Sequence, residues 1–152
     1  MTIIEDTNQK KGQHKNKHDY FEKEKIEVIR NRLPFGDYCL PPAISVDTKN
    51  SMAEIAANIG SDHKRFKNEC IKARDAGCKL IILVENTEGI DSIDKVHTWY
   101  NPDTIFRPRA ITGTRLEKAM KTMHERYGVV FEFCHPEESG ERIMELLGGD
   151  KQ

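Results

Sequence analysis

The run Leu80-Ile81-Ile82-Leu83-Val84 constrains the fold more than any other stretch of the chain. Unbroken apolar residues rich in Ile and Val predict a strand that is buried on both faces. A strand of this kind lies inside a sheet that has helices packed against both sides. The run ends at Glu85, which we interpret either as a surface residue or as a polar residue near a functional site. The chain is therefore predicted to have an α/β fold.

The remaining apolar patterns predict a mixed sheet flanked by helices. Spacings of three and four residues between apolar positions are typical of helices, whereas alternation and short apolar runs are typical of strands. Helices are expected over residues 19–25, 51–59, 61–76, 92–99, 114–127 and 139–147. Strands are expected over residues 2–6, 26–30, 37–40, 44–49, 79–84 and 129–134, with a polar loop at 8–17 and a break at Pro41-Pro42. The second, third and fourth of these strands are predicted to form a meander. Thr114 and Glu117 fit a capping box for the helix that begins there.

The overall charge gives no sign of nucleic-acid binding. The 152 residues include 24 Lys and Arg and 25 Asp and Glu, so the formal net charge is −1. A polyanion would therefore have to bind a local basic surface. The length, with no repeat or linker, predicts one domain over residues 1–152. No apolar run reaches membrane-spanning length, no signal-peptide pattern opens the chain, and the four cysteines form no C-x-x-C pair. We expect a cytoplasmic protein with reduced thiols and no membrane contact.

Two acidic motifs precede the apolar strand. The first is Gly36-Asp37-Tyr38, and the second is Asp47-Thr48-Lys49 at the end of the strand expected over 44–49. Because residues i and i+2 of a strand share a face, Asp47 and Lys49 are expected to lie side by side, within reach of Asp37. Two carboxylates can hold a divalent cation, and an ammonium can orient a water molecule, which together suit phosphodiester cleavage. The alternative is a chance Asp-x-Lys triplet in a chain with 32% charged residues.

The helix expected over 61–76 has a basic surface with two interpretations. It carries Lys64, Arg65, Lys67, Lys72 and Arg74. The surface is either solvated, helped by a pair such as Lys67 with Glu69, or it faces phosphates. The sequence pattern alone does not decide between them.

The order of these motifs resembles the XPF-type nuclease domain of the PD-(D/E)XK superfamily, in the small stand-alone form of bacteria and phages. The resemblance covers nearly the whole chain, through Asp6, the two acidic motifs, and residues 65–70, 80–85 and 112–149. It implies a restriction-endonuclease-like fold, with a mixed central sheet flanked by helices.

The resemblance also implies a Mg²⁺- or Mn²⁺-dependent DNA endonuclease. Asp37 and Asp47 match the metal ligands, with aspartate in place of the glutamate usual at the second position, and the backbone carbonyl of Thr48 would complete the set. Lys49 matches the catalytic lysine, and Asp6 matches the aspartate that ends the first strand.

Two positions depart from the family pattern. Asn8-Gln9 stands where relatives carry an arginine and a glutamate, which leaves a second metal ion in doubt. An acidic residue expected after the lysine is missing at Ala53, and Glu54 is the candidate substitute.

DNA contacts are expected mainly to the phosphate backbone, so that a branched or flap structure is recognised over a base sequence. The candidate residues are Lys64, Arg65, Lys67, Arg107, Arg109, Arg115, Lys118 and Lys121. Relatives often dimerise, which leaves a homodimer open. The expected setting is repair, recombination or phage DNA processing in the cytoplasm of a bacterial or phage-infected cell. One alternative is an inactive DNA- or partner-binding module of the same fold, and another is a nuclease that acts on RNA.

Overall fold

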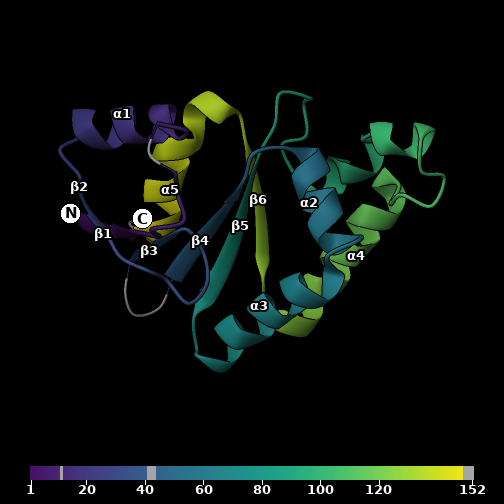
Figure 1. Ribbon diagram of the computed structural model, residues 1–152, viewed down its shortest axis with the longest axis horizontal. Helices are drawn as coiled ribbons and strands as arrows, with labels where there is room; N and C mark the ends of the chain where they lie inside the picture. The colour runs from purple at the N-terminus through teal and green to yellow at the C-terminus, as the bar shows by residue number, and fades with distance from the viewer. Residues whose placement is uncertain (11, 41–43, 149–152) are drawn as a thin grey trace.

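The computed structural model describes residues 1–10, 12–40 and 44–148. In this part of the chain, a six-stranded sheet has helices packed on both faces (Figure 1). The strands are β1 (Thr2–Glu5), β2 (Glu27–Arg30), β3 (Tyr38–Leu40), β4 (Ile44–Lys49), β5 (Lys79–Glu85) and β6 (Val130–Cys134). The α-helices are α1 (Lys15–Lys23), α2 (Met52–Ile59), α3 (His63–Asp75), α4 (Gly113–Tyr127) and α5 (Ser139–Leu147). Short 3₁₀ helices are η1 (Ile93–Thr98), η2 (Pro102–Ile105) and η3 (Pro136–Glu138). The predicted α/β fold with a mixed sheet is confirmed.

The strands follow the order β2-β1-β3-β4-β5-β6. Strands β4, β5 and β6 run parallel, β3 is antiparallel to both β1 and β4, and β1 is parallel to β2. The predicted meander is therefore wrong, because β1 lies between β2 and β3. Helix α1 supplies the crossover that two parallel strands need, so the chain returns as β2 on the outer side of β1. The other side of β1 is left for β3.

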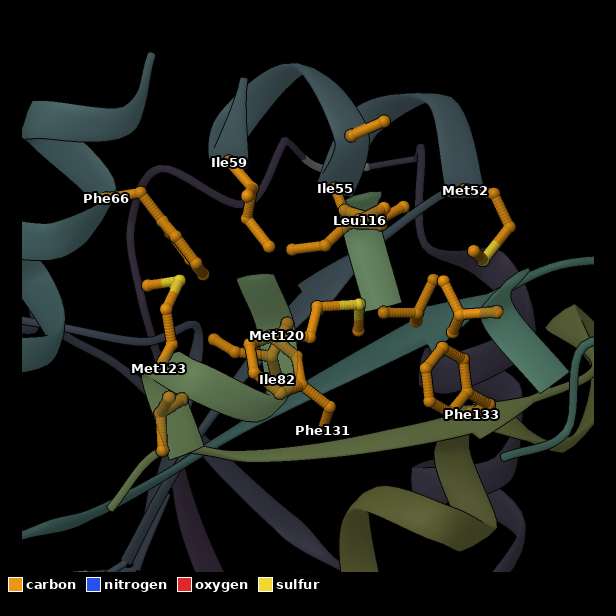
Figure 2. Close-up of a cluster of buried hydrophobic side chains, with 14 of the residues drawn as sticks. Met52, Ile55, Ile59, Phe66, Ile82, Leu116, Met120, Met123, Phe131 and Phe133 are labelled. Carbon is orange, nitrogen blue, oxygen red and sulfur yellow. The ribbon is translucent and has the colours of Figure 1, made fainter. Parts of the chain in front are cut away.

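Both faces of β5 are covered, as its apolar run predicts. Leu80, Ile82 and Val84 belong to the apolar cluster under α2, α3 and α4, whereas Ile81 and Leu83 belong to the cluster under α1 and α5. All five are at most 2% exposed. Figure 2 shows the first cluster, in which side chains of α2, α3 and α4 meet those of the sheet. The two layers of helices therefore cover the sheet from both sides.

Several element boundaries differ from expectation. Helix α1 begins at Lys15, inside the predicted loop, and its Lys17 side chain is buried at 3% exposure beside Glu85. The N-cap of α4 is Thr112, whose hydroxyl accepts a hydrogen bond from Arg115 N, so the cap predicted at Thr114 is wrong. The helix expected over 92–99 is the 3₁₀ helix η1. The predicted break at Pro41-Pro42 lies outside the described residues. Among the helices that are described, none is long and apolar enough to cross a membrane.

Replacing Gly113 by alanine is expected to destabilise the fold by about 1–3 kcal/mol, the cost of overpacking. A Cβ atom at this first residue of α4 would lie 2.3 Å from the carbonyl oxygen of Trp99 and 2.8 Å from that of Val96. Both neighbours are backbone atoms that cannot rotate away. Urea unfolding measures the loss. The matched control is Thr114→Ala one residue later, which is exposed and should cost nothing, since Thr112 provides the cap.

Candidate active site

Two aspartates are brought together by the pairing of β3 with β4: Asp37 just before β3 and Asp47 in the second half of β4. Asp37 directly precedes β3, and its backbone N donates to the carbonyl oxygen of Val46 at 2.7 Å. Asp47 follows Val46 on β4 and is 6% exposed. Gly36 allows this approach, because its φ is +75° and a Cβ atom there would lie 2.1 Å from Ser45 Oγ. The glycine of the Gly-Asp motif is thus required by backbone conformation and by space.

The Asp37 carboxylate is held over the next residue of β4. Its Oδ2 accepts hydrogen bonds from Thr48 N at 2.7 Å and Thr48 Oγ1 at 3.0 Å. Burial, followed by the charge of Asp47 and a hydrogen bond to it, raises the pKa of Asp37 well above its usual range. When two carboxylates are near enough to raise each other's pKa, charging both costs electrostatic free energy unless a cation lies between them. The pair is therefore arranged for a proton or a metal ion.

Lys49 lies beside Asp47, as the strand periodicity predicts. Its Nζ is 3.0 Å from Asp47 Oδ2 and 5.6 Å from the centre of the Phe66 ring. Burial acts to lower the pKa of Lys49, but the charge of Asp47, its hydrogen bond, and the nearby Glu69 and Glu54 carboxylates outweigh it, so the pKa is raised. The lysine therefore enters the site as an ammonium ion.

Glu69 is a third carboxylate at this site, which the sequence interpretation missed. Its Oε1 accepts a hydrogen bond from Gly36 N at 3.1 Å. Burial first, and the charge of Asp47 second, raise the pKa of Glu69. The suggested pairing with Lys67 is wrong, because residues two apart on a helix face different directions. The spacing of Arg65, Glu69 and Lys72, at i, i+4 and i+7, could have identified this face of α3.

Asp6 lies next to Asp37 across the β1–β3 pair. Its backbone N donates to the carbonyl oxygen of Asp37 at 2.7 Å, and its Oδ1 accepts from Leu33 N at 2.9 Å. The segment after Asp6 is held from β2, where Arg30 Nη2 donates to the carbonyl oxygens of Gln9 at 2.6 Å and Thr7 at 3.3 Å. Arg30 thus orders the segment in which Asn8 and Gln9 carry no charge.

These residues line one open cleft of about 830 Å³. Lys64 and Arg65 of α3 border it, together with Lys72, which the predicted basic surface of that helix included, and Arg32, which no prediction named. The other predicted contacts lie elsewhere. Lys121 forms ion pairs with Asp94 and Glu117. Arg107 Nη2 lies 3.9 Å from Asp103 Oδ2. The remaining four, Lys67, Arg109, Arg115 and Lys118, line hollows on the far side of α3.

The sequence matches the ERCC4 domain over residues 6–145. The chain belongs to the ERCC4-domain family. Two structures of XPF from Aeropyrum pernix are similar to this chain, one with a TM-score of 0.70 and the other, a complex with DNA, with a TM-score of 0.69. In both cases the identity is 18%, and the match covers 97% of this chain and 63% of that chain. None of the curated proteins matches this chain. The predicted XPF-type nuclease fold and family are confirmed.

The family implies a divalent metal ion, and a small donor set in this ERCC4 domain fits one. The described residues contain no group of three His, Cys, Asp or Glu arranged to hold a metal ion. Asp37 and Asp47 supply two carboxylates, and in the described part of the chain the buried Asp47 Oδ2 has the Lys49 ammonium 3.0 Å away as its ion-pair partner but no hydrogen bond of good geometry. The carbonyl of Thr48 points to the same side as its N–H, which donates to Asp37. Mg²⁺ is typically bound by one or two carboxylates and completed by water and phosphate.

Proposed function

We propose that this ERCC4 domain is a divalent-metal-dependent DNA endonuclease whose centre is Asp37, Asp47 and Lys49. The observation that carries the proposal is the buried Asp37–Asp47 pair with the Lys49 ammonium 3.0 Å from Asp47, within a cleft that Lys64 and Arg65 border. A bound Mg²⁺ or Mn²⁺ would neutralise a phosphate oxygen and acidify a water molecule. Asp37, Asp47 and the Thr48 carbonyl would hold it.

The chain's own groups have distinct tasks in this proposal. Lys49, fixed by Asp47 and the Phe66 ring, donates to the oxygen that gains charge in the transition state. Glu69 has a raised pKa and is positioned to accept a proton in the cleft. Asp6 lies beside Asp37 and adds negative charge to the same end of the cleft.

The cleft would hold DNA through its phosphates. Lys64, Arg65, Arg32 and Lys72 are basic residues of its lining, and cations contacting phosphates carry little sequence information. A branched or flap structure is therefore the proposed substrate. Arg107 and Lys121 stay predicted contacts, each with an acidic neighbour. Homodimerisation also stays a prediction, which light scattering would check.

A cleavage panel tests this proposal. The purified chain is incubated with end-labelled flap, splayed-arm, linear and single-stranded DNA and with RNA, in Mg²⁺, Mn²⁺ or EDTA. We expect cleavage of branched DNA in either metal and none in EDTA. Cleavage of RNA alone would replace DNA as the substrate. DNA binding without cleavage in any metal would favour the alternative, an inactive binding module of the same fold.

A further inference from the structure

We propose that the groove between α3 and α4 is a second DNA-binding track, which holds a duplex arm of the substrate while the scissile strand lies in the catalytic cleft. The proposal rests on the DNA-cleaving function proposed above. It assigns the two faces of α3 to two different segments of one branched DNA.

The groove is continuous along the two helices. It consists of two hollows of about 470 and 390 Å³ that share His63, Arg115 and Ala119. Helices α3 and α4 lie side by side (Figure 1). The basic residues of the groove are Lys67 from α3, Arg109 from the segment before α4, and Arg115, Lys118 and Arg126 from α4.

Its charge is one-sided in a chain that is nearly neutral. The chain has 25 Asp and Glu against 24 Lys and Arg, yet none of the described residues lining the groove is acidic. In the described part of the chain, no acid lies within ion-pairing distance of any of the five Lys and Arg side chains. By contrast Lys121, on another side of α4, meets both Asp94 and Glu117. An ordinary solvated face mixes charges as that side does, whereas unneutralised cations on two facing helices fit a polyanion.

The lining favours duplex DNA over a single strand. Single-strand tracks combine cations with free aromatic rings on which bases stack. Among Phe, Tyr and Trp, the described lining of this groove contains only Tyr127, which packs against the core and whose ring centre lies 5.7 Å from the Arg74 guanidinium carbon. The one other ring of the described lining is the single imidazole of His63, which gives no row of rings for successive bases. From Arg115 to Arg126, α4 extends about 16 Å at 1.5 Å per residue, which matches about five base pairs. The groove therefore fits the phosphates of a duplex segment.

Helix α3 separates the two tracks. Lys64, Arg65 and Lys72 line the catalytic cleft, while His63 and Lys67 line the groove. No described residue lines both. Tracks on either side of one helix fit two arms that diverge at a branch, since each arm would follow its own row of cations.

The test is a triple charge reversal, Lys67→Glu with Arg115→Glu and Lys118→Glu. Binding to a fluorescent three-way junction and to a linear duplex of equal length is measured by anisotropy in EDTA over a range of salt, so cleavage is not required. We expect about a tenfold weaker affinity for the junction and a smaller loss for the linear duplex. The slope of log affinity against log salt should become shallower by about three, since each lost phosphate contact removes about 0.9.

The matched control reverses three exposed lysines away from the groove, Lys23, Lys25 and Lys79, with the same change in net charge. An equal loss in this control, or an unchanged slope in the groove variant, overturns the proposal. An RNA duplex of equal length is assayed in the same way, and a loss of affinity for this RNA alone overturns the assignment to DNA. If the triple Glu variant does not fold by circular dichroism, the corresponding triple Gln variant must show the same change in slope. A wild-type chain that cuts nothing would overturn the nuclease proposal and leave this binding result to stand by itself.

Discussion

Asp47→Asn leaves a folded chain that still binds DNA but cleaves it at least about 10³-fold more slowly than the wild type. The substitution keeps the shape of the side chain and removes one of the two carboxylates proposed to hold the metal ion. A loss of about 4 kcal/mol in transition-state stabilisation corresponds to this factor. Single-turnover cleavage of a labelled flap in Mg²⁺ measures it. The matched control is Asp75→Asn, an exposed acid at the end of α3 that should cut at the wild-type rate. Near-wild-type cleavage by Asp47→Asn would contradict the assigned centre.

Asp47→Asn is also expected to change how the stability of the metal-free chain depends on pH. Burial and the charge of Asp47 raise the folded pKa of Asp37 above its unfolded value. The folded chain then binds the proton more tightly, so the stability of the metal-free wild type falls as pH rises from about 4 through the folded pKa. Asp47→Asn removes the neighbouring charge and should flatten this decline. Urea midpoints at acidic and neutral pH, without metal, measure the difference, and an unchanged decline would show that Asp47 does not act on Asp37.

Lys17→Met is expected to destabilise the fold by about 3–5 kcal/mol, because it leaves a buried carboxylate without its partner. Lys17 Nζ lies 2.8 Å from Glu85 Oε2, and the two side chains are only 4% and 7% exposed. Helix α1 is thereby tied to the carboxyl end of β5, close to the segment after Asp6. Urea unfolding measures the loss.

Two further variants separate the buried pair from a general effect of removing a lysine. The double variant Lys17→Met with Glu85→Met removes both charges and should return to within about 1 kcal/mol of the wild type. Lys15→Met removes an exposed lysine that pairs with Asp19 on the same helix and should leave stability unchanged. A double variant no more stable than Lys17→Met alone would show that the loss came from packing.

Local patterns predicted the parts of this fold that depend on neighbours in sequence. The apolar run of β5 indicated burial on both faces, since alternate side chains must each find a covering layer. The i, i+2 rule placed Asp47 and Lys49 on one face, and the ion pair between them confirms it. The helix pattern likewise predicted a helix over residues 114–127, and α4 forms there with Leu116 and Met120 packed in the core.

The features that were missed depend on contacts between distant parts of the chain. Placing β1 between β2 and β3 requires knowing which side of β1 the α1 crossover takes. Lys17 is polar and predicted as loop, and only the distant Glu85 explains its burial in a helix. In the sequence, Glu69 is one charge among many on α3. The hydrogen bond that it accepts from Gly36 N joins residues 33 positions apart. Long-range partners of this kind leave no periodic signal in the sequence.

Uptake of Mn²⁺ tests the central claim most directly. The signal of free Mn²⁺ in electron paramagnetic resonance is followed as the metal is added to the wild type and to Asp47→Asn, both without DNA. The wild type is expected to remove about one ion per chain from solution, and the variant is expected to leave the free signal as it is in buffer. Equal uptake by both proteins, or none by either, would contradict the Asp37–Asp47 metal centre.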